Sequence, residues 1–171
     1  MSLYTSVSGR ITQIDWFSTD PARIGCSLMF TLQSEEQGIV NLVLDGSVYV
    51  LNSRPLNVGQ QATFFYSSSA PVPLIYPPQY RAVAAAHTPS GTFAALDVFT
   101  QTASGSQLAD TDNTLQLNLS GRTRIILPNG QPFGGALSGK LLLVIYRTTT
   151  RSIPPQTSPE LIVVFCEDGI S

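Results

Sequence analysis

The feature that most constrains this chain is an internal repeat, which points to two similar units in series. The stretch Asn-Leu-Val-Leu-Asp-Gly at 41–46 aligns with Gln-Leu-Asn-Leu-Ser-Gly at 116–121. Further along, Gly59 and Gly139 each stand seven residues before a tyrosine. Each half then reaches Pro-Pro-Gln and closes on an apolar segment. Because these signals recur in the same order, we interpret the chain as the product of an internal duplication.

The repeat also sets the domain boundaries. It predicts one domain over residues 1–86 and a second over 92–171, joined at 87–91, where His87 precedes the turn-forming run Thr-Pro-Ser-Gly. We therefore expect His87 to lie on a linker. A unit of roughly 80 residues has a modest core of its own. The two halves are accordingly expected to pack on each other.

Hydrophobicity alternates with a period of two, which is typical of β-strands, and helical periodicity is almost absent. The turn signal at 34–38 between two alternating runs predicts a hairpin over 26–44. In the first half the other expected strands are 7–14, 48–51, 59–66 and 81–86. In the second half they are 92–100, 116–121, 123–126, 139–146 and 160–165. Single helical turns are expected at 20–23 and 55–58. Five strands in about 80 residues predict an all-β fold of two tandem five-stranded OB-like barrels. A pair of small open sandwiches is the alternative.

One predicted strand is apolar on both faces. In 141–146, Leu141, Leu143 and Ile145 alternate with Leu142, Val144 and Tyr146. A strand buried on both faces needs a cover outside its own barrel. We expect that cover to be the other half of the chain or a second copy of the protein.

Charge disfavours a nucleic-acid partner. The 171 residues carry a formal net charge of −2, whereas neutralisation of phosphates requires a basic patch. The closest basic grouping lies in the second half and comprises Arg122, Arg124, Lys140, Arg147 and Arg151. A surface rich in Ser, Thr, Asn and Gln repels itself weakly, which favours a protein partner or a homo-oligomer.

Targeting signals and membrane segments are not visible in the sequence. The longest apolar runs, at 141–146 and 161–166, are too short to span a bilayer. The first residues do not read as an export signal. We expect no membrane span, and both a cytoplasmic and a cell-surface or secreted location stay open.

No constellation for catalysis, metal or cofactor binding is apparent. Cys26 and Cys166 do not form a zinc pattern, and we expect them to be free and buried, with one disulfide as the alternative. A single histidine excludes a multi-histidine metal site. No Gly-x-Ser-x-Gly elbow occurs. The chain is therefore predicted not to be an enzyme and to need no cofactor.

Aromatic residues supply the candidate binding site. Trp16 and Phe17 follow the first strand, where an OB barrel places a binding loop, and Tyr49 is expected on the outward face of its strand. With Met29 they can form a platform for a sugar or a single-stranded nucleic acid. The basic residues Arg122 and Arg124 complete the candidate set. The alternative is that Trp16 and Phe17 only cap the end of the barrel.

A second motif is interpreted as structural. It comprises Tyr66, Pro77, Pro78 and Gln79 in the first half, and Tyr146, Pro154, Pro155 and Gln156 in the second. Paired prolines fix φ and cannot donate hydrogen bonds, so we expect a short polyproline stretch leading into the final strand. Each glutamine is expected to be half-buried and to bond loop backbone through its amide.

Two runs resemble a known group of proteins. The segment Ile-Tyr-Arg-Thr-Thr-Thr-Arg-Ser-Ile-Pro-Pro-Gln at 145–156, followed by Pro-Glu-Leu-Ile-Val-Val at 159–164, resembles a domain of Firmicutes proteins that often follows a copper amine oxidase-like N-terminal domain. The segment 70–83 is similar to short, stand-alone proteins of the same group. The resemblance implies tandem OB-like units and no defined activity. It does not imply copper, because the oxidase-like segment and histidine clusters are missing.

These observations favour a non-catalytic interaction or structural module. The alternative is a protein that binds a ligand, a sugar or a single-stranded nucleic acid on a barrel face. Loss of binding with rising salt would identify phosphate contacts and so separate the two.

Overall fold

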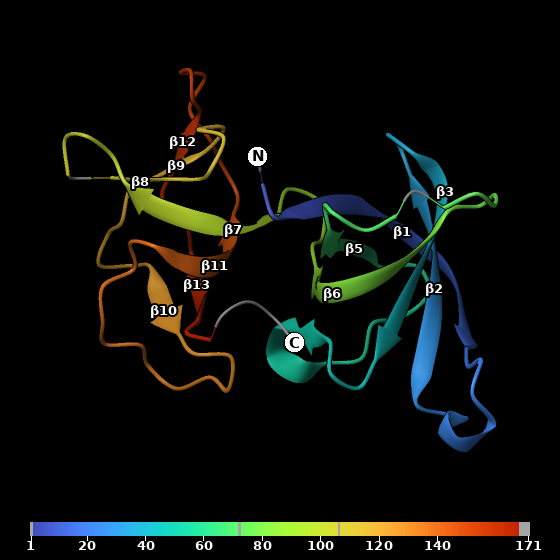
Figure 1. Cartoon of the computed structure of the whole chain (residues 1–171). Helices are drawn as coiled ribbons and strands as arrows, with labels where there is room; N and C mark the ends of the chain where they lie inside the picture. Colours follow the sequence, from blue (N-terminus) through green and yellow to red (C-terminus); the bar gives the residue numbers. More distant parts are fainter. Residues whose placement is uncertain (1, 72, 106, 168–171) are drawn as a thin grey trace. The chain divides into compact units, whose positions relative to one another are not determined.

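The computed structural model describes residues 2–71, 73–105 and 107–167, and the chain divides into two compact units (Figure 1). The N-terminal unit consists of residues 4–90. The C-terminal unit consists of the described residues from Gly91 onward, together with residues 2 and 3. Strands dominate both units, as the alternating pattern predicts, and none of the described helices is long and apolar enough to cross a membrane.

The N-terminal unit is a closed barrel. Its elements are β1 (Tyr4–Trp16), η1 (Pro21–Arg23), β2 (Ser27–Ser34), β3 (Gly38–Asp45), β4 (Tyr49–Val50), η2 (Leu51–Ser53), β5 (Gln61–Ser67) and β6 (Gln79–His87). Strand β1 pairs with β2 and β5, β2 pairs with β3, and β5 pairs with β6, all antiparallel. A parallel pairing of β3 with β6 closes the ring, and β4 runs beside β6. This circuit is the predicted OB-like barrel.

Strand β1 pairs with a different strand along each half of its length. Residues 4–10 pair with β5, and residues 10–16 pair with β2. A Cβ atom built on Gly9 would lie 2.3 Å from the backbone oxygen of Gln33. Only glycine therefore permits this close approach of β1 to the end of β2. The register shifts again between Ile11 and Gln13, which makes Thr12 a bulge.

Alternate inward side chains of these strands form the core of the N-terminal unit. Its buried members are Val7, Ile11, Phe30, Leu32, Val40, Leu42, Leu44, Leu56, Ala62, Phe64, Tyr66, Ala82 and Ala85. The rings of Phe30 and Phe64 are 5.6 Å apart. Burial of these apolar surfaces is the main force that holds the barrel closed.

The C-terminal unit repeats the same connections in a more open sheet. Its strands are β7 (Phe93–Gln101), β8 (Leu108–Ala109), β9 (Gln116–Leu117), β10 (Arg124–Ile126), β11 (Lys140–Tyr146), β12 (Gln156–Thr157) and β13 (Leu161–Phe165). Strand β11 lies between β7 and β13, as β5 lies between β1 and β6. The counterpart of β6 is split into β12 and β13 around Pro159, which has no N–H for a ladder. The result is a curled half-barrel.

The repeat in the sequence is thus matched in structure. Strand β9 pairs in parallel with β12 through Gln116 and Gln156, as β3 pairs with β6 through Asn41 and Gln79. The N–H groups of Gly59 and Gly139 each donate a 2.8 Å bond to the first strand of their unit. Both glycines have φ near the left-handed region, at 93° and 84°. Strands β5 and β11 therefore hold equivalent positions in their sheets.

Several local predictions are wrong. The peptide bonds Tyr76–Pro77 and Ile153–Pro154 are cis, so each Pro-Pro segment is a bend rather than a polyproline stretch. His87 is the last residue of β6, paired with Ala62, and does not lie on a linker. The thiols of Cys26 and Cys166 are free, as expected, but exposed. The helical turn at 20–23 is found as η1, whereas that at 55–58 is replaced by η2 at 51–53.

Strand β11 is buried on both faces, as its apolar pattern predicts. Leu142 and Val144 belong to the core of the C-terminal unit. Leu141, Leu143 and Ile145 alternate with them and are also buried. The inward face is therefore the one that carries Leu142 and Val144, and the face that needs an outer cover carries Leu143.

Candidate functional site

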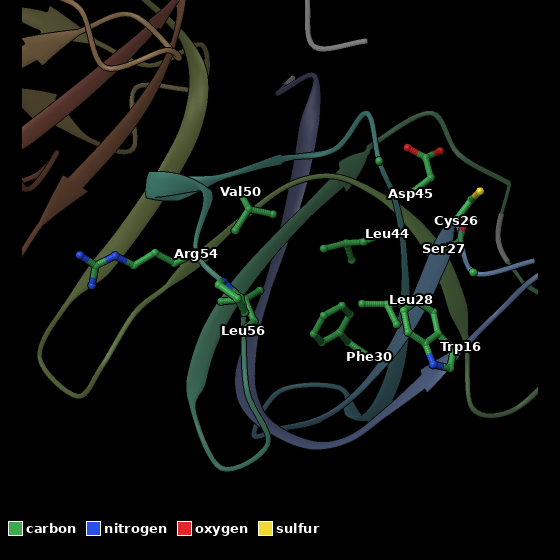
Figure 2. A pocket seen from close by; sticks show the side chains of 13 residues that line it. Trp16, Cys26, Ser27, Leu28, Phe30, Leu44, Asp45, Val50, Arg54 and Leu56 are labelled. Carbon is green, nitrogen blue, oxygen red and sulfur yellow. The ribbon is translucent and has the colours of Figure 1, made fainter.

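A pocket of about 270 Å³ opens at one end of the N-terminal barrel (Figure 2). It lies where β1 and β3 end, where β2 begins, and where the segment between β4 and β5 passes. Its lining residues are Trp16, Gly25, Cys26, Ser27, Leu28, Phe30, Leu44, Asp45, Gly46, Val50, Arg54, Pro55 and Leu56. The pocket is therefore the mouth of the barrel.

The floor of the pocket is part of the barrel core. Phe30, Leu44 and Leu56 are buried core residues, and Leu28 and Val50 pack against the same core. Figure 2 shows Phe30, Leu28 and Leu44 gathered around one space. An apolar floor of this kind favours an apolar group as ligand and offers few partners to a polar one.

Trp16 stands on the rim with 72% of its surface exposed. It is the last residue of β1 and faces Leu28 across the β1–β2 ladder. The loop beyond it is tied down locally, because the Phe17 N–H donates to the Ser27 carbonyl at 3.0 Å and the Asp20 carboxylate caps η1. A large apolar ring is thus held in water beside an apolar pocket.

One fixed negative charge lines the pocket. The Asp45 carboxylate accepts bonds from the backbone N–H of Ser47 at 2.8 Å and from its hydroxyl at 2.5 Å. These bonds, with smaller help from Arg81 and Arg23, lower the pKa of Asp45 below its ordinary value of 3.8. Arg54 also lines the pocket, but its guanidinium is directed away from the space in Figure 2.

In the C-terminal unit, the connection between β10 and β11 corresponds to the β4–β5 connection that lines the pocket, and its own apolar side chains pack against the core. Between β10 and β11, Leu137 is buried in the core and Phe133 packs against it. The Lys140 ammonium lies 5.9 Å from the centre of the Phe133 ring. In the N-terminal unit, by contrast, the connection between β4 and β5 leaves room for a pocket.

Of the residues proposed from the sequence, Trp16 lines the pocket. Phe17 is half-buried next to it and lies outside the lining, as do Met29 on the outward parity of β2 and Tyr49 on β4. Burial raises the pKa of the Tyr49 hydroxyl. The structure does not join these side chains into one lining.

The basic candidates belong to the other unit. Arg122 and Arg124 are exposed at the start of β10 in the C-terminal unit. In the same unit, the Arg147 guanidinium is paired with the Glu160 carboxylate at 3.2 Å. This pairing reduces the positive charge that the second half can offer to a phosphate backbone.

The structural motif is held in different ways in the two units. Tyr66 stacks on Tyr80 with ring centres 4.0 Å apart, and Tyr146 stacks on Phe93 at 5.7 Å. The Gln156 side chain accepts bonds from the amides of Asn118 at 3.0 Å and Gln107 at 3.3 Å. These partners are side chains and not the predicted loop backbone. Gln79 is half-buried, and its side chain makes no hydrogen bond to the part of the chain that the structure describes.

Among residues 2–71, 73–105 and 107–167, no group of three or more His, Cys, Asp or Glu side chains lies in metal-binding proximity. The Asp110 carboxylate is engaged by its own turn, accepting the N–H groups of Thr114 and Leu115. The turn at 110–113 is therefore built around Asp110 by local hydrogen bonds.

Sequence reasoning missed most of the pocket. Asp45 is the last residue of β3, and Arg54 and Leu56 come from a connection that has no period-two pattern, so nothing in the sequence places them beside Trp16. Compared with known proteins, the chain matches no family model and no curated protein. The resemblance to the Firmicutes domain accordingly stays a prediction.

Proposed function

We propose that this chain is a non-catalytic binding module and that its N-terminal barrel receives an apolar side chain of a protein partner. The observation that carries the proposal is Trp16, a 72% exposed tryptophan on the rim of a pocket floored by barrel core. Tryptophan is enriched among the residues that dominate protein interfaces, where it packs into or beside apolar pockets. A single apolar anchor fits a pocket of this size and lining.

The charge around the pocket supports a protein partner over a nucleic acid. Asp45 lines the pocket as a carboxylate, and Asp15 directly precedes Trp16. A phosphate backbone would meet these negative charges, and the cations nearest to Asp45, Arg23 and Arg81, already interact with its carboxylate. A sugar stacking on Trp16 is the second candidate, and the exposed indole face is the observation that favours it.

Trp16 itself provides the first measurement, because it is the chain's single tryptophan. Its fluorescence is followed during titration with capped leucine amide, with a neutral oligosaccharide and with oligothymidylate at low and high salt. We expect the emission to shift to shorter wavelength with the apolar amide alone. A response to the oligosaccharide would favour the sugar, and a salt-sensitive response to oligothymidylate would favour nucleic acid.

The two exposed thiols provide a built-in control. Cys26 lines the pocket, whereas Cys166 lies in the C-terminal unit. Occupation of the pocket should slow maleimide labelling of Cys26 and leave that of Cys166 unchanged. Equal protection of both thiols, or of neither, would contradict the proposed site.

A matched pair of substitutions completes the test. Trp16→Ala should weaken binding on the order of tenfold or more, as for an interface hot spot. Ile24→Ala removes an exposed apolar side chain from the same loop, outside the pocket lining, and should leave binding unchanged. Labelling of Cys26 reports binding in both variants.

A further inference from the structure

We infer that the partner binds as an extended segment that adds a strand to the free edge of β1, with one apolar side chain in the barrel mouth. The inference rests on the proposed function and names the form of the partner. It combines a row of unpaired backbone groups with a pocket at the end of that row. Proteins that bind a peptide by strand addition combine these two features, because the main-chain hydrogen bonds supply affinity and the pocket supplies specificity for a side chain.

The edge of β1 is open on one side beyond Ile11. The pairing with β5 ends at Arg10 and Gln61. Past it, Ile11 exchanges bonds with the turn that carries Gly59 and Gln60. From Gln13 to Trp16, β1 pairs with β2 alone in the described part of the chain. That stretch therefore presents one unpartnered edge.

The register shows which backbone groups are free. The Phe17 N–H donates to the Ser27 carbonyl, so Phe17 and Ser27 form a hydrogen-bonded pair. In an antiparallel ladder these pairs alternate with non-bonded ones. Gln13 and Asp15 consequently point their N–H and C=O groups toward β2, and Ile14 and Trp16 point theirs away from it. A row of such groups is a template for another strand.

The pocket lies where this edge ends. Trp16 belongs to both, as the last residue of the free edge and as a rim residue of the pocket. An added strand that pairs with Ile14 and Trp16 is thereby carried to the pocket mouth. Its side chains alternate in direction, so one can enter the pocket while its neighbours stay in solvent.

The charges beside the pocket indicate which side chains the bound segment carries. Asp45 lines the pocket as a carboxylate, Arg81 and Arg23 attract it more weakly than its Ser47 hydrogen bonds do, and the Arg54 guanidinium is directed away from the space. Asp15 lies on the free stretch of β1. A lysine or arginine next to the apolar anchor complements these carboxylates. The occupant is thus an extended peptide with one apolar anchor and a basic neighbour.

The probe for the test is a peptide selected from random dodecapeptides displayed against the intact chain, then synthesised. Amide hydrogen exchange is measured by NMR with and without it. We expect the Ile14 and Trp16 amides to exchange roughly tenfold more slowly when the peptide is bound. The Gln13 and Asp15 amides serve as the matched control, because β2 already binds them and their exchange should not change.

Methylation of the peptide's backbone nitrogens tests the same contact from the other side. Methylation of a peptide nitrogen whose N–H faces β1 should lower the affinity on the order of tenfold. Methylation of the intervening nitrogens, which face away from β1, should leave the affinity unchanged. The Asp45→Asn variant should bind a peptide with a basic neighbour several-fold more weakly. Both measurements leave the free edge of β1 unaltered.

The outcomes separate the inference from the proposed function. If the peptide shifts Trp16 fluorescence and protects Cys26 but leaves the Ile14 and Trp16 amides unprotected, strand addition is wrong and the pocket proposal stands. If no selected peptide affects Trp16 or Cys26, the proposed function itself fails. Protection of Ile14 that rises with protein concentration in the absence of peptide would identify a second copy as occupant and overturn the assignment to a separate partner.

Discussion

At the scale of single residues, Asp45 links the pocket to pH. Its carboxylate is stabilised first by the Ser47 hydroxyl and then by the Ser47 N–H, so its pKa is lowered in the folded state. A carboxyl with a lowered folded pKa adds stability above its unfolded pKa, and this contribution is lost as the pH falls through the folded value. The acid side of the stability curve therefore contains a contribution from Asp45.

Replacement of Ser47 by alanine removes the larger of the two bonds. We expect the pKa of Asp45 to rise toward 3.8 without fully reaching it, because the backbone N–H of residue 47 remains. The titration of the Asp45 carboxyl carbon, followed by NMR, measures the change. Added salt screens the weaker attraction of Arg81 and Arg23 and should have a smaller effect. An unchanged pKa in Ser47→Ala would remove the hydroxyl bond from the explanation.

A second residue-scale prediction uses the repeat as its own control. Gln156 accepts bonds from Gln107 and Asn118, whereas the equivalent Gln79 makes no side-chain bond to the described residues. Gln156→Ala should lower the free energy of unfolding by about 1 kcal/mol, the scale of a lost hydrogen bond. Gln79→Ala should cost clearly less. Urea denaturation of the two variants measures both free energies of unfolding. Equal decreases in Gln156→Ala and Gln79→Ala would contradict a stabilising role for the bonds that Gln156 accepts from Gln107 and Asn118.

At the scale of the element, the close approach of β1 to the end of β2 depends on Gly9. In Gly9→Ala the new Cβ would meet the Gln33 carbonyl oxygen at 2.3 Å, and the obstacle is backbone that cannot rotate away. Forced overpacking of this kind typically costs about 1–3 kcal/mol. Gly46→Ala is the control, since a Cβ there meets nothing within 4 Å. The midpoint of thermal unfolding should fall in Gly9→Ala and stay unchanged in Gly46→Ala. A Gly9→Ala protein as stable as the parent would contradict the close approach of Gly9 to the Gln33 backbone.

Strands are predicted correctly from the sequence where one buried face imposes an apolar residue at every second position. Predictions are wrong or missing where no such alternation occurs. The β2–β3 hairpin and the positions of β5 and β11 follow from alternating apolar residues and from glycines at strand starts. The predicted strand at 116–121 is reduced to Gln116–Leu117, and beyond it the Asn118 N–H still donates to the Thr157 carbonyl at 2.8 Å. Gly9 carried no signal, since its need arises from a crossing of segments distant in sequence.

The candidate site was less predictable for the same reason. Trp16 could be named because it follows a strand at the place where OB-like barrels carry a binding loop. The floor of the pocket comes from core residues whose pattern signals burial alone, and its far wall comes from the irregular connection at 51–56. A pocket requires that a space stay unfilled, and no local pattern in a sequence reports an unfilled space.

At the scale of the whole molecule, the outer face of β11 is covered as well as its inner face. Leu143 is fully buried although it alternates with the core residues Leu142 and Val144. A strand apolar on both faces is stable in water only when both faces are covered. The exposed fraction of Leu143 is already zero in the single chain, so we predict that the cover is part of the chain and that its stability does not depend on protein concentration. Leu142→Asp does not test this, because it breaks the barrel core itself.

Leu143→Asp places a charge on the outer face alone. Burial of an unpaired carboxylate is costly, so we expect the variant to lose several degrees of thermal stability. We also expect it to bind more of a dye specific for exposed apolar surface. Leu119→Asp changes an already exposed leucine of the same unit and should have little effect. Parent and variants are melted over a wide range of protein concentration, because the midpoint of an interface between copies rises with concentration and that of an interface within one chain does not. A Leu143→Asp protein with the parent's midpoint at every concentration would show that the outer face of β11 needs no cover.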